Sequence, residues 1–227
     1  MSPPTFFTDL RVVLAKDLRL DWRERGRMVA VLVFGVTTLL LFSFAGHDTN
    51  KLKAQAAGYL WLAILLCSTL SLSGSFAAEM QNRALEGLRL LPLDTRALYF
   101  GKALANLGVL LVLGTALIPV MVVLYDVQVK LGIPMLLGVI LLGAAGLSGP
   151  GTLHAALAAR VRGGDVLLPL LLFPLVVPNL LAATRATTLV IGGDPMNELR
   201  SWLGLLLCFN LVYWPLCGLL YGRVLED

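Results

Sequence analysis

Charged residues are scarce in this chain. Asp, Glu, Lys and Arg make up 14% of its 227 residues, whereas hydrophobic residues make up 58%. Soluble domains carry about 25% charged residues and do not need uncharged apolar runs of about 20 residues. Runs of that length cross the hydrocarbon core of a bilayer when they fold as helices. The composition therefore excludes an ordinary soluble domain and predicts an all-α integral membrane protein, with membrane lipids as its surroundings.

The net charge of +4 does not indicate a nucleic-acid surface. Proteins that bind single strands combine a basic groove with aromatic side chains on which bases stack. No basic cluster of this sequence is interleaved with aromatic residues in that way. We therefore expect the positive charge to lie in loops, and we expect no nucleic-acid partner.

Motifs for nucleotide binding and catalysis are missing as well. A phosphate loop needs G-x-x-x-x-G-K-[S/T], but Gly101-Lys102 is followed by Ala103. The sequence has no G-x-S-x-G elbow and no H-E-x-x-H pair. The cores of the apolar runs also lack acidic and basic residues, which argues against a proton- or sodium-coupled transporter with a carboxylate relay. We predict that the chain itself is not an enzyme.

Cysteine and histidine, which serve as metal and haem ligands, are few. Cys67, Cys208 and Cys217 all lie in apolar runs without a C-x-x-C pair, so we interpret them as small hydrophobic residues and predict no metal site. His47 stands in a polar loop, and His154 lies in an apolar run beside a glycine-rich stretch. His154 could be an axial haem ligand, but a hydrogen bond to a neighbouring carbonyl is the interpretation we favour. We therefore predict no cofactor bound by this chain.

What remains is a series of apolar runs that predicts six transmembrane helices, at residues 28–45, 58–78, 97–125, 131–159, 166–183 and 201–221. Short connections join them, so residues 1–227 are predicted to form one transmembrane domain. Residues 5–22 precede the first run and have the pattern of an amphipathic helix in the membrane interface. Its predicted apolar face holds Phe6, Phe7, Leu10, Val13, Leu14, Leu18 and Trp22, and its polar face holds Asp9, Arg11, Lys16 and Arg19.

Lysine and arginine are unevenly shared between alternate loops. If the N-terminus lies inside the cell, thirteen of the eighteen Lys and Arg residues fall in inner segments and five fall in outer segments. Cytoplasmic loops carry an excess of these residues. The distribution predicts that both termini, and the loop between the second and third spans, face the cytoplasm.

That loop contains a short amphipathic segment, residues 79–93. Leu85, Leu88 and Leu91 recur at three-residue spacing, with Glu86 and Arg89 beside the stripe they form. Pro92 indicates that the helix ends there, because a proline disfavours the helical conformation of the residue before it. We predict a surface helix that a soluble partner can grip. A solvated linker whose leucines dip into the headgroups fits the periodicity equally well.

The fourth and fifth spans contain residues that disfavour a regular helix. Gly149, Pro150 and Gly151 interrupt the fourth run, and Pro169, Pro174 and Pro178 recur within the fifth. Proline removes a helix hydrogen bond, and in lipid the freed carbonyl needs another partner. The pattern predicts helix breaks that line protein or a water-filled cavity. Ordinary proline kinks are the alternative.

Two blocks of sequence carry a resemblance to a known family. The first comprises F-A-A-E at 76–79, L-E-G-L-R-L-L-P-L at 85–93 and the following Lys102; the second comprises L-S-G-P-G at 147–151 and R-G-G-D-V-L-L-P-L-L-L-F-P-L-V-V-P-N-L-L at 162–181. With these blocks and its six-span layout, nearly the whole chain resembles the CcmB family, the haem exporter protein B permeases of cytochrome c maturation.

The resemblance implies an ABC-2-type permease-like fold in the bacterial inner membrane. It implies a separate cytoplasmic ATPase partner, CcmA-like, that binds ATP, together with CcmC- and CcmD-like membrane subunits that handle haem. It further implies a haem chaperone, CcmE-like, released on the outer side, and a second copy of the chain. Under this reading Glu79, Leu85, Glu86, Leu88 and Leu91 form the surface that couples to the ATPase.

Two other functions stay open at this point. An ABC-2-type exporter permease for a lipid, glycan or drug would share the coupling helix but not the two proline-containing blocks. A membrane haem-binding chaperone without an ATPase would instead use His154 as a ligand.

Overall fold

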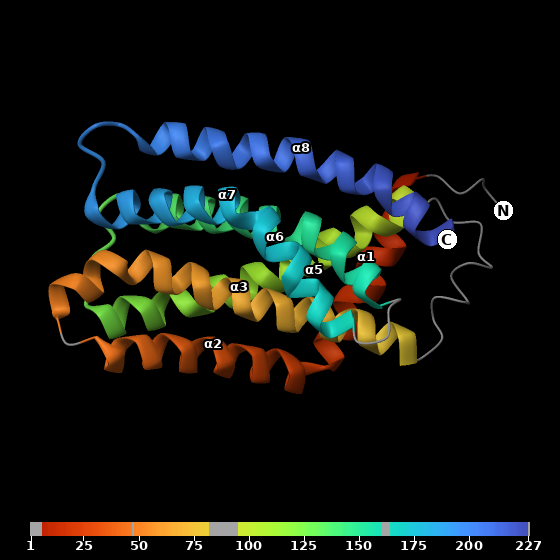
Figure 1. The fold of residues 1–227 in the computed structure, drawn as a ribbon, viewed down its shortest axis with the longest axis horizontal. Helices are drawn as coiled ribbons and strands as arrows, with labels where there is room; N and C mark the ends of the chain where they lie inside the picture. The colour runs from red at the N-terminus through yellow and green to blue at the C-terminus, as the bar shows by residue number, and fades with distance from the viewer. Residues whose placement is uncertain (1–5, 47, 82–94, 160–163, 227) are drawn as a thin grey trace.

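The fold is entirely helical in the part of the chain that the computed structural model describes, residues 6–46, 48–81, 95–159 and 164–226. The helices are α1 (Phe6–Arg23), α2 (Arg25–Ala45), α3 (Thr49–Gln81), α5 (Thr95–Tyr125), α6 (Ile133–Ala159), α7 (Gly164–Gly192) and α8 (Leu199–Glu226). They form an elongated bundle in which α1 and the C-terminal end of α8 lie at the same end (Figure 1). The all-α fold expected from the composition is confirmed.

All the helices from α2 to α8 are long and apolar enough to cross a bilayer, which gives six candidate spans in the described residues. The shortest of these helices has 21 residues and the longest has 33. At about 1.5 Å per residue these lengths correspond to about 32 to 50 Å, which exceeds the hydrocarbon thickness of about 30 Å. The prediction of six apolar spans is confirmed.

Two helices extend beyond the predicted limits of their spans. The second span begins at Thr49 rather than at residue 58, and the fifth continues to Gly192 rather than ending at residue 183. The end of α7 is rich in threonine, a residue that disfavours a prediction of helix, so the sequence suggested a loop there. In the helix, however, Thr188 Oγ1 donates a hydrogen bond to the carbonyl of Thr184 (2.9 Å), and the hydroxyl of Thr187 accepts one from Trp61.

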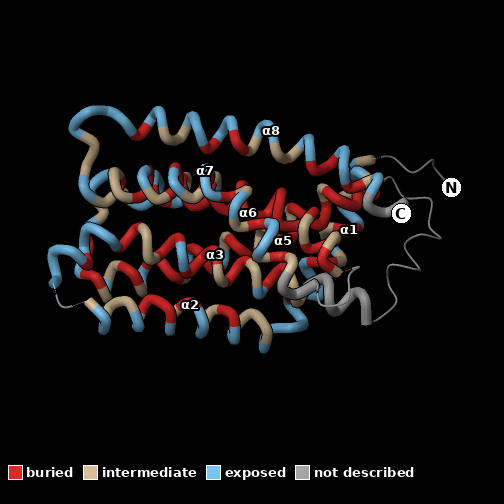
Figure 2. The backbone as a smooth tube through the Cα atoms, in the orientation of Figure 1, coloured by how far each residue is buried: buried red, intermediate tan, exposed pale blue. Residues whose placement is uncertain are grey.

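Helix α6 lies at the centre of the bundle and packs against α3, α5, α7 and α8. Its second half is buried almost continuously, as the buried residues in the middle of the bundle show (Figure 2). Gly143, Gly146, Gly149 and Gly151 occur along this half, and a Cβ atom at any of them would press against a side chain of a neighbouring helix. Small residues of this kind let membrane helices approach closely.

Polar side chains from the neighbouring helices bind the backbone of α6. Asn179 of α7 donates to the carbonyl of Gly143 (2.9 Å), and Asn210 of α8 donates to that of Leu142 (2.9 Å). Trp214 of α8 donates to the carbonyl of Ala145 (3.0 Å). These bonds fix the orientation of α7 and α8 against one turn of α6.

The packing face of α1 differs from the predicted apolar face. The residues buried along α1 are Asp9, Val13, Asp17 and Asp21, whereas Phe7 and Trp22 are exposed. The buried stripe packs mainly against α5. The face that carries Asp9, which we expected to be polar and exposed, therefore packs against the bundle. The reason lies in the basic side chains of the bundle that meet these acids.

Candidate functional site

The predicted coupling residues fall almost entirely outside the part of the chain that the structure describes. Leu85, Glu86, Leu88 and Leu91 fall within residues 82–94, outside the described residues, and the side chain of Glu79 is likewise not described. The flanks of this segment are described, because α3 extends to Gln81 and α5 begins at Thr95. The described residues nearest to the coupling segment in sequence are therefore the end of α3 and the start of α5, and α1 packs against α5.

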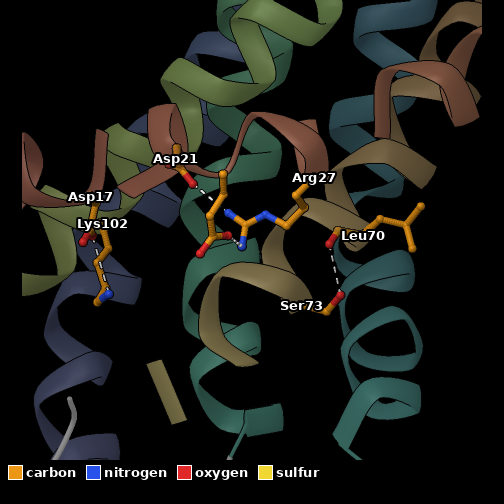
Figure 3. A network of polar contacts seen from close by, with 7 residues as sticks. Asp17, Asp21, Arg27, Leu70, Ser73 and Lys102 are labelled. Carbon is orange, nitrogen blue, oxygen red and sulfur yellow. Dashed lines mark hydrogen bonds and ion pairs between the residues drawn. The ribbon is translucent and has the colours of Figure 1, made fainter. Parts of the chain in front are cut away.

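A buried ion pair joins α1 to the start of α5. Lys102 lies in the second turn of α5 and is 3% exposed, and its Nζ is 3.5 Å from Oδ2 of Asp17 (Figure 3). Lys16 approaches the other oxygen of the same carboxylate at 3.2 Å. Next to Lys102, Gly101 lets α1 come close, since a Cβ atom there would lie 2.8 Å from the side chain of Val13. A charge buried in this way is costly unless it is paired, so Lys102 holds α1 in this position.

Arg27 forms a second charged junction, at the start of α2. Its Nη2 is 2.7 Å from Oδ1 of Asp21, and its Nη1 is 2.8 Å from Glu24 (Figure 3). Burial raises the pKa of the Asp21 carboxyl, against the opposing effect of the Arg27 charge. The stem of Arg27 packs on α3, where a Cβ atom at Gly74 would lie 3.1 Å from its Cδ.

The two junctions connect α1 to both helices that flank the coupling segment. Arg27 contacts α3 seven residues before α3 ends at Gln81, and Lys102 lies seven residues after α5 begins at Thr95. A displacement of the segment between these helices would thus reach α1 through the ion pair of Lys102 on the α5 side, and through the packing of Arg27 on α3 and its ion pair with Asp21 on the other side. The arrangement can transmit motion.

The glycine-proline segment of α6 does not break the helix. Helix α6 continues from Ile133 to Ala159 with Pro150 inside it, so the expected interruption at Gly149, Pro150 and Gly151 is not present. All three residues are buried. Neighbouring helices pack around them. From α5, for example, the hydroxyl of Tyr99 donates a hydrogen bond to the carbonyl of Gly149 (3.1 Å).

His154 lies one turn beyond Pro150 and is partly buried. Its Nδ1 is 2.8 Å from the carbonyl oxygen of Pro150, which makes Nδ1–H the donor and Nε2 the free ring nitrogen. This hydrogen bond to a neighbouring carbonyl is the contact that we favoured over haem ligation. Among the described residues, no second observation points to haem at this position.

The prolines of the fifth span also lie within a continuous helix. Helix α7 runs through Pro169, Pro174 and Pro178 without interruption, so the predicted break is absent here too. Pro169 is partly exposed, whereas Pro174 and Pro178 are exposed on the surface of the single chain. In the single chain these two prolines therefore line neither protein nor an internal cavity. Helix hydrogen bonds before and after each proline are sufficient to continue the helix across it.

Comparison with known proteins identifies the family. The family model described as "CcmB protein" matches residues 8–220. The chain belongs to the CcmB family. The heme exporter protein B of Pseudomonas aeruginosa is 32% identical over 208 residues, which cover 90% of this chain and 92% of the relative. That of Rhodobacter capsulatus is 35% identical over 179 residues (76% and 79% of the two chains), and that of Escherichia coli K12 is 32% identical over 204 residues (88% and 90%).

Membership makes this CcmB-family protein a membrane component of cytochrome c maturation. The match begins at residue 8 and so includes almost all of α1 as well as the six candidate spans. The resemblance that we drew from the two sequence blocks is confirmed over most of the chain.

Sequence reasoning missed the ion pairs that hold α1 in this CcmB-family protein. Asp17 and Asp21 were not assigned a role, and Lys102 was noted only as the start of the third span. One signal was available in the sequence: Asp9, Val13, Asp17 and Asp21 recur every four residues, so they share one helix face. What the sequence could not show is that Lys102, 85 positions from Asp17, meets this face.

Proposed function

We propose that this chain is the permease subunit of an ABC-type complex that acts in cytochrome c biogenesis. A separate cytoplasmic ATPase, CcmA-like, binds the segment 79–93 and hydrolyses ATP. The permease converts that event into haem delivery, or into release of the haem-loaded, CcmE-like chaperone, on the outer side of the membrane. CcmC- and CcmD-like membrane subunits and a second copy of the chain complete the assembly. In this proposal the protein lies in the bacterial inner membrane with both termini in the cytoplasm.

The observation that carries the proposal is the paired ion contacts beside the coupling segment. Lys102 on α5 and Arg27 against α3 tie both flanks of the segment to the acids of α1. A force applied to the segment by an ATPase would be shared at once among α1, α2, α3 and α5. A simple solvated linker would not need contacts to α1 from both of its flanks, one of them a buried ion pair.

The binding step would use the leucine stripe of the segment. Leu85, Leu88 and Leu91 would enter an apolar groove of the ATPase, and Glu79 and Glu86 would pair with basic side chains at its rim. Glu86 lies just beside the stripe in sequence, which suits a position at the edge of the buried contact. This division of roles makes Leu88, at the centre of the stripe, the position most sensitive to charge.

Substitution of Leu88 tests the proposal. Loss of a central anchor commonly costs about 2 kcal/mol or more at an interface, so Leu88→Asp should reduce co-purification of the ATPase by about 30-fold in mild detergent. Membrane insertion and the thermal midpoint should stay unchanged, because the segment lies outside the spans. The yield of mature cytochrome c should fall in parallel with the loss of the ATPase.

The matched control is Leu90→Asp. Leu90 lies two residues from Leu88, which places it about 200° around a helix and therefore off the stripe. This variant should recruit the ATPase normally. Normal recruitment by Leu88→Asp would refute the coupling surface, and equal loss in both variants would favour the solvated linker.

A further inference from the structure

A cavity of about 380 Å³ lies at the end of the bundle opposite to α1. Helix α3 begins at this end and α7 ends there, away from the chain termini (Figure 1). Its apolar lining includes Ala54 and Ala57 of α3, Val127 between α5 and α6, and Ile191 of α7. Sites for small ligands have volumes of about 300–1,000 Å³ and a mainly apolar lining with a few polar groups. The cavity therefore has the size and the walls of a ligand site.

The charged side chains among the described lining residues are Lys53 of α3, and Asp126 and Lys130 of the connection between α5 and α6. Lys53 Nζ donates to Asp126 Oδ2 at 2.6 Å, and Lys130 Nζ donates to the carbonyl of Gly192, the last residue of α7, at 2.9 Å. These bonds hold both ammonium groups at the cavity. An ammonium has three N–H donors, so in the described contacts each lysine keeps donors for a ligand. Two cations and one carboxylate leave one positive charge in excess, which favours an anion.

The cavity lies where the charged parts of two helices give way to uncharged sequence. Residues 54–78, which follow Lys53, and residues 166–184, which precede Arg185, contain no Asp, Glu, Lys or Arg. As helices these stretches are about 38 and 29 Å long, against a hydrocarbon core of about 30 Å. Lys53 and Arg185 therefore mark the boundary of the hydrocarbon at this end. Thr188, one turn beyond Arg185, lines the cavity, so the cavity lies at the level of the lipid headgroups.

We propose that this cavity binds the headgroup of an anionic phospholipid from the membrane leaflet at this end of the bundle. The phosphate accepts charge-assisted hydrogen bonds from Lys53 and Lys130, and the carbon atoms next to it lie against Ala54, Ala57 and Ile191. The acyl chains leave the cavity toward the bilayer. The proposal does not rest on ATPase coupling, because α3 leads to the segment 79–93 only at its opposite end.

The combination of lysines and apolar walls distinguishes a lipid from a free anion. Inorganic phosphate would use the lysines and leave the apolar walls in water, whereas a phospholipid covers both. The excess positive charge distinguishes between phospholipids as well. Phosphatidylglycerol carries a net negative charge, but phosphatidylcholine brings a cation of its own to the two lysines, so the cavity should prefer the former.

Native mass spectrometry of the full chain in detergent tests the site, because it counts bound lipids and reads the oligomeric state together. Phosphatidylglycerol and phosphatidylcholine are added in separate titrations. We expect one phosphatidylglycerol per chain to bind about tenfold more tightly than phosphatidylcholine. It should also raise the thermal midpoint, since a ligand that binds only the folded state stabilises that state. Inorganic phosphate is the probe for the anion alone and should leave the midpoint unchanged.

Variants of the cavity locate the bound lipid. Lys53→Gln combined with Lys130→Gln should weaken phosphatidylglycerol binding about 30-fold. Lys51→Gln is the matched control, because Lys51 lies at the same end of α3 but is 80% exposed, pairs with Asp48 and does not line the cavity. It should bind as the unmodified protein does. Ala54→Trp keeps both lysines and fills the cavity, so it should lose the lipid as well, whereas Ala54→Ser should retain it.

Equal affinity of the double lysine variant and Lys51→Gln for phosphatidylglycerol would overturn the proposal. Equal binding of the two phospholipids would overturn it too, as would a rise of the midpoint with inorganic phosphate that matches the rise with phosphatidylglycerol. Loss of a dimer instead of a lipid in the double variant would assign the cavity to a second copy of the chain. The ATPase should co-purify normally with the double variant, which separates failure of this site from failure of the coupling surface.

Discussion

At the scale of single residues, α6 depends on glycines that face rigid neighbours. Gly143 faces Trp61 of α3, and a Cβ atom there would overlap the indole ring. The ring cannot move aside easily, because its Nε1 donates to Thr187 Oγ1 at 2.8 Å and the side chain is 1% exposed. Close packing of α6 against α3 therefore requires glycine at this position.

The expected consequence is a large effect of a single methyl group. Gly143→Ala should destabilise the protein by about 1–3 kcal/mol or more, through overpacking against Trp61. Gly138→Ala, five residues earlier in the same helix, meets nothing within 4 Å and should be neutral or slightly stabilising. Thermal midpoints of the two variants in detergent measure the difference. Equal midpoints would mean that the contact between α6 and α3 is looser than the structure indicates.

At the scale of elements, the position of α1 depends on the pair between Lys102 and Asp17. Lys102→Met leaves the buried Asp17 carboxylate with only the partly exposed Lys16 beside it, so the loss should approach the cost of about 3–5 kcal/mol for removing one partner of a buried pair. Adding Asp17→Asn removes the unpaired charge, so the double variant should recover at least half of the loss. Thermal unfolding of the two single variants and the double variant gives the coupling between them.

Lys16→Met is the control for this pair. Lys16 lies 3.2 Å from Asp17 but is 39% exposed, and exposed ion pairs contribute about 0–1 kcal/mol. The midpoint of this variant should stay close to that of the unmodified protein. A loss as large as that of Lys102→Met would show that general charge balance, rather than the buried pair, holds α1.

The helices themselves were predictable, whereas their contacts were not. Apolar runs of about 20 residues have one physical solution in lipid, so the number of spans followed directly from the sequence. The end of α7 was missed because its threonines satisfy their hydroxyls within the bundle. The identity of the buried face of α1 was missed because aspartates are buried only where a cation on another helix, such as Lys102, pairs with them. The residues that decide which face of α1 is buried therefore lie on α5, and the sequence of α1 alone does not reveal them.

At the scale of the whole molecule, polar bonds are concentrated on the central helix. Asn179, Asn210 and Trp214 donate to one turn of α6, while Asn106 of α5 donates to the hydroxyl of Thr152 at 2.9 Å. Because lipid is as apolar as the helix surfaces, these bonds and close packing at glycines select the arrangement of the spans. The prolines of the sequence suggested breaks in α6 and α7, but both helices are continuous. The sequence thus indicated that α6 and α7 contain unusual residues, but it did not reveal that both helices would stay continuous.

The orientation of this bundle is the last expectation, and it rests on charge alone. Arg11 is exposed on α1, at the end of the bundle predicted to be cytoplasmic, and Met196 is 79% exposed in the connection between α7 and α8 at the other end. Thirteen of the eighteen basic residues fall in segments that the sequence predicts to be inner. Since an excess of Lys and Arg marks the cytoplasmic side, Met196 should face outward and Arg11 inward.

Cysteine labelling measures this orientation. Of the native cysteines Cys208 is exposed, so Cys208→Ser gives a background in which the remaining two, Cys67 and Cys217, are buried. In that background a membrane-impermeant maleimide should label Met196→Cys in intact spheroplasts, and should label Arg11→Cys only after permeabilisation. The reverse pattern would place the segment 79–93 outside the cell, where no cytoplasmic ATPase could reach it. The proposed coupling and the positive-inside count would then fail together.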